Sequence, residues 1–265
     1  MKNNEHIKYT SDEILQILID FYNFQSNFDS EVDKGHDITF QTTIEEWRNI
    51  CDLVELNKLA KYYYELFELK TNQSDLIDMF SGKNECTLRE FCEYIAQHAS
   101  KEKINPVMSL GASCQEAAIF KTLKIKLEEK GIDTKNFKPS TEFIPFFNKH
   151  AAEVVEIVSK LSPGSFTEYN IKNNVINRIG AVLFLFAIVI LIGSSILHKF
   201  TWFLFIPLAV ALLLLFIGNK LKAAQYEIGG YHTIRDLIMG MKGKAKDNVS
   251  GKQQQPDNII LPPIK

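Results

Sequence analysis

The chain contains little cysteine. Its 265 residues include four cysteines, all in the first half of the sequence, at positions 51, 86, 92 and 114. They all lie in the N-terminal region, which we predict to be cytoplasmic, and a reducing compartment would leave them as free thiols.

Motifs of several common enzyme and metal-binding classes are also absent. The sequence has no P-loop, no dinucleotide-binding glycine fingerprint and no G-x-S-x-G elbow. Cys86, Cys92 and His98 are spaced six residues apart, whereas zinc ligands usually come in pairs two to five residues apart. The acidic stretch 29–40 has alternating acids, as a calcium loop has, but Phe40 occupies the position that needs a bidentate Glu. We expect no cofactor and no metal.

Positive charge is scarce in the first two thirds of the chain. The residues up to 174 include 28 acidic and 20 basic side chains, net −8, and the rest include 4 acidic and 10 basic ones, net +6, which together give −2. An acidic N-terminal region argues against nucleic acid as a partner. The abundance of Lys, Asn, Ile and Phe is typical of a bacterial chain from an AT-rich genome.

What the first 160 residues do contain is a series of helix starts. Four segments have Ser or Thr followed three residues later by Glu, which is the capping-box pattern. Each of them opens a run with apolar residues at helical spacing. The predicted N-caps are Thr10, Thr43, Thr87 and Ser113. We therefore predict an all-α fold, with a cytoplasmic helical domain over residues 1–161 and a linker over 162–178.

Two long uncharged runs follow the linker. Residues 179–197 and 200–218 hold nineteen residues each, without Asp, Glu, Lys, Arg or His. Each would form a helix of about 28 Å, close to the hydrocarbon thickness of a bilayer. The hydropathy predicts a transmembrane hairpin over 179–218, because only His198 and Lys199 separate the runs.

Basic residues flank this predicted hairpin at its two outer ends. Arg178 precedes the first run and Lys220 and Lys222 follow the second, whereas Lys199 alone lies in the turn. The positive-inside rule then places both termini in the cytoplasm and the chain in a bacterial inner membrane. The polar N-terminus, which does not resemble a signal peptide, agrees with this orientation.

The C-terminal part reads as two further segments. Residues 219–244 are predicted to be a basic segment beside the membrane, with Gly229 and Gly230 weakening a continuous helix. Residues 245–265 are predicted to be a disordered tail. The sequence shows no internal repeat of fixed period.

Cys114 is the single candidate for catalysis. It follows Ser113 at a predicted helix start, where the positive end of the helix favours a thiolate. A helix cap explains the same residues without chemistry. His98 and His150 are the nearest candidate bases, but nothing in the sequence brings either of them to the thiol.

Three functions follow from these patterns. The favoured one is a membrane-anchored helical module that recruits a protein partner to the inner membrane and needs no catalytic residue. The second is a two-span effector that forms homo-oligomeric pores under the control of its cytoplasmic head. The third is a membrane-associated cysteine enzyme that uses Cys114.

Overall fold

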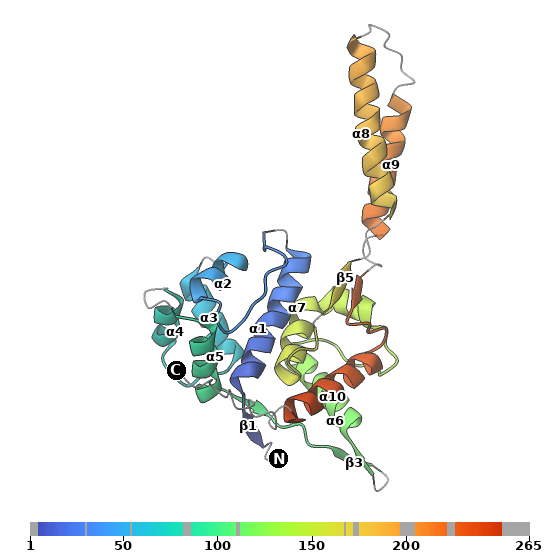
Figure 1. Ribbon diagram of the computed structural model, residues 1–265. Coiled ribbons are helices and arrows are strands. Elements are labelled where there is room, and N and C mark those ends of the chain that lie inside the picture. The colour runs from blue at the N-terminus through green and yellow to red at the C-terminus, as the bar shows by residue number, and fades with distance from the viewer. Residues whose placement is uncertain are drawn as a thin grey trace, which may run out of the picture.

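Helices make up most of the described chain, and the strands are short. The computed structural model describes residues 5–29, 31–53, 55–81, 86–109, 112–166, 168–171, 175–196, 205–221 and 226–250 (Figure 1). The helices are α1 (Ser11–Phe28), α2 (Ile44–Ile50), α3 (Leu56–Leu66), α4 (Gln73–Phe80), α5 (Leu88–His98), α6 (Gln115–Glu129), α7 (Phe143–Leu161), α8 (Val175–Ile196), α9 (Phe205–Leu221) and α10 (Ile234–Ser250). The strands are β1 (His6–Lys8), β2 (Ser100–Glu102), β3 (Val107–Ser109), β4 (Ala112–Cys114), β5 (Tyr169–Ile171) and β6 (Tyr226–Ile228).

The strands form three antiparallel ribbons of two strands each, β1–β2, β3–β4 and β5–β6. Each strand has only three residues, too few for the polar and apolar alternation that identifies a strand in a sequence. The all-α prediction therefore missed these small ribbons, although helices dominate the fold.

The predicted transmembrane hairpin is the main correction. Across the part of the chain that the structure describes, we find no helix whose length and apolar character suffice to cross a membrane. The helix in the second apolar run, α9, ends with Asn219, Lys220 and Leu221, so its uninterrupted apolar part is about 14 residues or roughly 21 Å, shorter than a membrane span needs.

Three further predictions depended on those transmembrane spans and are not supported either. They are the inner-membrane location, the cytoplasmic orientation of both termini and the membrane as a partner. The two-span pore and the membrane anchor of the favoured function had the same basis. Arg178 lies in α8 and Lys220 in α9, while Lys222 lies outside the described residues, so their role as membrane-flanking charges has no support.

The part of the structure outside the α8–α9 hairpin, which we call the body, consists of two units. The first unit contains α1 to α5. Its loop before α2 and its loop before α5 are joined through a short antiparallel bridge between Thr43 and Thr87. The backbone N–H of Ile44 donates to the carbonyl oxygen of Cys86 at 2.8 Å, and the N–H of Leu88 donates to the carbonyl of Thr42 at 2.9 Å. These bonds hold the starts of α2 and α5 side by side.

The second unit, made of α6, α7 and α10, repeats this arrangement. Its bridge joins Glu142 and Thr233. The N–H of Phe143 donates to the carbonyl of His232 at 2.9 Å, and the N–H of Ile234 donates to the carbonyl of Thr141 at 3.0 Å. The starts of α7 and α10 are therefore joined as those of α2 and α5 are.

The last helices of the two units also match in sequence and burial. Each is preceded by Thr and begins with an aliphatic residue, Arg and an acid, in the sequences "TLRE" at the start of α5 and "TIRD" at the start of α10. The buried residues fall at the same helical positions, which are Leu88, Phe91, Cys92 and Ile95 in α5 and Ile234, Leu237, Ile238 and Met241 in α10. The body thus contains one helical arrangement twice, although the sequence shows no fixed period.

A kink in α7 fits the same correspondence. The backbone of His150 is non-helical, with φ −137° and ψ 35°, so α7 consists of two helices joined at this residue. His150 follows Phe143, the first residue of α7, at the same distance in sequence as Cys51, the C-cap of α2, follows Ile44. The kink therefore corresponds to the break between α2 and α3. Pro145 lies in the first turn of α7, where its missing backbone N–H removes no hydrogen bond within the helix.

The α8–α9 hairpin is inserted into the second unit, so the two units do not repeat at a constant spacing in the sequence. Strands β5 and β6 pair at its base, and the two helices extend away from the body side by side (Figure 1). In the first unit the corresponding stretch of chain leads through α4 to α5 instead. The insertion changes the spacing between matching residues, so a search for a constant period fails.

The two units meet at a buried carboxylate. Asp20 of α1 has no exposed surface and accepts hydrogen bonds from the backbone N–H groups of Gly164, at 2.9 Å, and Phe166, at 3.2 Å. Burial raises the pKa of Asp20 to about 6, and these two hydrogen bonds act in the opposite direction. In the same turn, the carbonyl oxygen of Ser165 accepts a hydrogen bond from the Tyr231 hydroxyl at 3.0 Å.

Two predicted segments are therefore parts of the body. The expected linker, 162–178, contains Phe166, which is fully buried, and the turn bound by Asp20. Within the expected basic segment, 219–244, α10 buries its apolar face against α6 and α7. The helix continues to Ser250, into the expected tail, and residues 251–265 lie outside the described part of the chain.

Candidate binding groove

An apolar groove lies between α1, α3 and α7. Its volume is about 520 Å³. Aromatic and aliphatic side chains form most of its wall, namely Phe21, Phe24, Leu59, Tyr62, Tyr63 and Val155. The first unit supplies α1 and α3 and the second supplies α7, so the groove follows the junction of the two units.

Helical spacing brings these side chains to one surface. On α3, Leu59, Tyr62 and Tyr63 are three and four residues apart, which places them on the same face of the helix. On α1, Phe21 and Phe24 have the same kind of spacing. Each helix therefore contributes one continuous apolar stripe to the groove.

Tyr62 is the most accessible aromatic residue of the wall. Its side chain is 43% exposed, whereas the neighbouring Tyr63 is 4% exposed and belongs to the core. The Tyr62 ring contacts Phe21, with centroids 6.3 Å apart, and meets Tyr63 edge-on at 5.2 Å. Aromatic packing thus holds the ring of Tyr62 in place while part of its surface remains open.

A polar rim borders the groove on the side of α3. Asp52, Glu55 and Lys58 line it there, and Glu55 pairs with Lys58 at 2.7 Å. Both partners are largely exposed, so the pair contributes little to stability. Asp52 remains as an additional acid, and the rim as a whole has a net negative charge.

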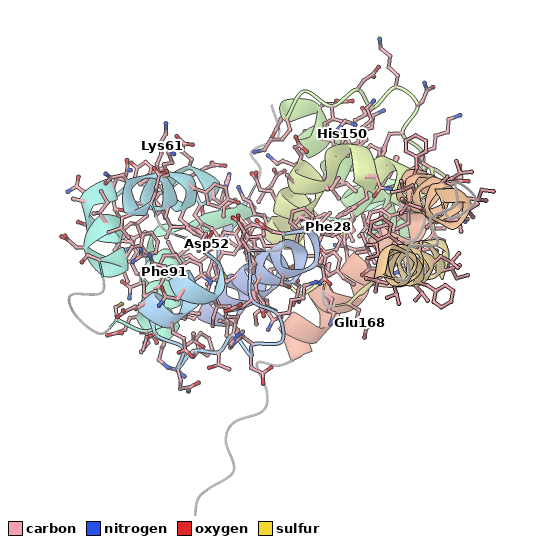
Figure 2. The ribbon with its side chains drawn as sticks, turned by 90° about the horizontal axis from the view of Figure 1, so that it is seen from above. Phe28, Asp52, Lys61, Phe91, His150 and Glu168 are labelled. Carbon is pink, nitrogen blue, oxygen red and sulfur yellow. The ribbon has the colours of Figure 1, made fainter. Side chains whose placement is uncertain are left out.

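The turn before α3 places Asp52 on this rim. Its backbone has a positive φ of 50°, a conformation in which Asp is enriched among non-glycine residues. Figure 2 shows Asp52 near the middle of the body and Lys61, from the same region, at its outer edge with the side chain directed away. Lys61 therefore provides a matched position outside the groove.

A second recess, of about 670 Å³, lies beside β1 and β2, but its charged groups satisfy one another. Lys101 pairs with Glu13 at 2.6 Å, with 14% and 13% of the side chains exposed. Lys103 pairs with Glu5 at 2.9 Å. These pairs leave no unpaired charge in this set of residues to recognise a ligand.

The predicted N-caps lie where the sequence placed them, with one exception. The hydroxyls of Thr10 and Thr43 accept from the N–H groups of Glu13, at 3.2 Å, and Glu46, at 3.1 Å. Thr87 is the N-cap of α5 and donates its N–H to Glu90 at 2.7 Å.

Ser113 is not an N-cap, because it lies in β4 and pairs with Met108 of β3. The helix α6 begins one residue later, and its N-cap is Cys114. Glu116, the expected partner of Ser113 in a capping box, instead pairs with Lys242 at 2.8 Å. The short ribbon β3–β4 thus shifts the start of the helix.

Cys114 is half-buried, and its Sγ accepts the backbone N–H of Ala117 at 3.4 Å. The two candidate bases have other contacts. His98 Nδ1 lies 2.8 Å from the carbonyl oxygen of Tyr94, and the ring of His150 packs 5.2 Å from Phe146. Among the described residues, no hydrogen bond or ring contact joins the imidazole of His98 or of His150 to the Cys114 thiol.

The other cysteines are buried, and burial raises the pKa of the Cys51 thiol to about 12 and of the Cys86 thiol to about 11. In the described part of the chain, no group of three or more His, Cys, Asp and Glu side chains has the arrangement of a metal site. Asp29, from the calcium-like stretch, accepts the N–H of Glu31 at 2.9 Å, as in an ordinary Asx turn.

Comparison with known proteins assigns no class. The chain matches no family, no curated protein sequence and no solved structure. The groove is therefore the feature from which a function is argued. The groove is not predictable from the sequence, since the spacing of Leu59 and Tyr63 indicates a buried helix face without showing which members of that face stay exposed.

Proposed function

We propose that the helical body is a binding module that recruits a protein partner, and that the groove between α1, α3 and α7 receives an apolar segment of that partner. The observation that carries the proposal is the half-exposed ring of Tyr62 on an otherwise apolar aromatic wall. Tyrosine is enriched at protein interfaces, and a few aromatic anchors usually supply most of the binding energy.

The geometry of the groove suggests the chemistry of the partner. A groove of this size accommodates one or two large apolar side chains, such as those that an amphipathic helix presents on one face. Asp52 and Glu55 on the rim favour Lys or Arg beside those anchors, because opposite charges steer association. Recruitment of this kind needs no catalytic residue.

The proposal is tested by purification of the full-length chain, crosslinked in its native cells, in three forms. These are the wild type, Tyr62→Ala, which removes the exposed anchor, and Lys61→Ala, which changes the neighbouring side chain outside the groove. We expect one partner near stoichiometric amount with the wild type and with Lys61→Ala. With Tyr62→Ala its recovery should fall about thirtyfold, which corresponds to a hot spot of about 2 kcal/mol.

Circular dichroism of the variants provides the control for folding, since Tyr62 is half-exposed and its truncation should leave the helix content unchanged. Equal recovery of the partner with Tyr62→Ala and with the wild type would show that the partner binds elsewhere. Absence of any stoichiometric partner would contradict recruitment itself.

A further inference from the structure

A third recess, of about 260 Å³, lies between the end of α3, the helices α6 and α7, and the ribbon β1–β2. Unlike the groove, it is lined mainly by lysine and glutamate side chains. Its lysines are Lys101, Lys126, Lys130 and Lys160. The carboxylates around them decide which of these amines is available for a reaction.

Three of the four lysines have a close carboxylate. The pairs are Lys101 with Glu13 at 2.6 Å, Lys126 with Glu129 at 2.8 Å and Lys130 with Glu156 at 2.7 Å. A close carboxylate favours the charged form of a lysine, which has no free electron pair for bond formation. These three lysines are therefore explained as members of ion pairs.

Lys160 of α7 differs from them. Its side chain is 25% exposed, and the ion pair that it forms within the described part of the chain, with Glu68, spans 4.0 Å. Glu68 is 86% exposed, so water screens its charge. The amine of Lys160 is thus largely withdrawn from water and has no close carboxylate to compensate.

These surroundings lower the pKa of the Lys160 ammonium. Burial is the main cause, because it disfavours the charged form. The carboxylates of Glu68 and Glu156 oppose the shift, whereas the like charges of Lys130 and Lys126 act in the same direction as burial. Lys160 therefore holds a larger fraction of free amine at neutral pH than an ordinary lysine does.

From the recess, the burial of the side chain and the long ion pair, we propose that Lys160 is a modification site, at which the side-chain amine takes up a small acyl group from an acyl phosphate. The neutral amine attacks the carbonyl carbon and forms a C–N bond. The bond from that carbon to the phosphate oxygen breaks, the phosphate leaves with the electron pair, and the amine releases one proton to water. The recess has room for a donor of this size.

The product at Lys160 is a neutral amide, so the modification removes a positive charge from the recess. The ion pair between Lys160 and Glu68, which lies just after α3, is then lost. Since Lys160 belongs to the second unit and Glu68 to the first, the modification removes one charge contact between the two units. It requires no partner protein and does not depend on the groove.

Incubation of the purified full-length chain with acetyl phosphate at neutral pH tests this site. Mass spectrometry then measures the acetylation rate of each lysine. Two native lysines are matched controls. Lys130 lines the same recess in a close ion pair, and Lys121 of α6 is exposed and forms no ion pair among the described residues. We expect Lys160 to react about three- to tenfold faster than either, because a pKa lower by one unit raises the fraction of free amine about tenfold.

The same reaction in the chain unfolded by guanidinium chloride provides the control for local sequence. The advantage of Lys160 should disappear there, since it depends on the folded recess. A rate at Lys160 equal to or below that of Lys121 in the folded chain would overturn the proposal. A faster rate at Lys160 that persists in the unfolded chain would overturn it as well.

Discussion

Trp47→Ala is expected to lower the free energy of unfolding of the chain by about 3–5 kcal/mol, the usual cost of truncating a large buried aromatic side chain. Trp47 is 2% exposed and lies at the centre of an aromatic cluster in the first unit. Its ring centroid is 5.8 Å from Tyr63, 6.2 Å from Phe80 and 6.1 Å from Phe91. The residues are drawn from α2, α3, α4 and α5, so the cavity would loosen four helices.

Urea unfolding followed by circular dichroism measures this effect. Trp47→Phe is the matched control, because it keeps an aromatic ring in the cluster and should cost less than Trp47→Ala. A loss below about 1 kcal/mol for Trp47→Ala would mean that the cluster does not hold the first unit together.

The second large effect concerns the pH dependence of stability through Asp20. Its folded-state pKa of about 6 lies above the ordinary value of 3.8. Between these two values the folded chain holds one proton more than the unfolded chain. The contribution of Asp20 to the free energy of unfolding is therefore fully present below about pH 4. It is lost as the pH rises through 6, by about 3 kcal/mol in total.

Asp20→Asn should remove this part of the pH dependence. The amide keeps the size of the carboxyl group and does not titrate. Its carbonyl oxygen is its only acceptor, whereas the carboxylate accepts one hydrogen bond at each oxygen, from Gly164 and from Phe166. The measurement is the difference in unfolding free energy between wild type and variant from pH 4 to pH 7. A difference that stays constant over this range would contradict a raised pKa for Asp20.

Local signals in the sequence predicted local structure well. Threonine followed by glutamate marks the starts of α1, α2 and α5, because a cap depends only on residues within one helical turn. The start of α6 was shifted by one residue, because Cys114 ends a three-residue strand whose pairing with β3 no local pattern reveals.

Features that depend on distant residues were missed. The buried face of α10 has an ordinary helical spacing, but its neighbourhood of apolar runs favoured a membrane interpretation. The repeated arrangement of the two units was hidden because the α8–α9 hairpin interrupts the second copy. Asp20 looked like any polar residue of α1, since the turn that buries it comes more than 140 residues later.

The groove was missed for the same reason. Its wall joins α1 and α3 of the first unit to α7 of the second, so it exists only when the two units meet. The spacing of Leu59 and Tyr63 on α3 is typical of a buried helix face, and Tyr63 is indeed buried. Tyr62, one residue earlier, is left half-exposed by the shape of the junction, which the sequence does not encode locally.

Photocrosslinking from the groove tests recruitment most directly. The photoreactive residue p-benzoylphenylalanine would replace Tyr62 in the full-length chain in its native cells, and in a matched chain it would replace Lys61. The account predicts that position 62 forms an adduct with one segment of one protein, with apolar residues and a neighbouring Lys or Arg, and that position 61 does not. Adducts spread over many proteins, or equal labelling from both positions, would contradict it.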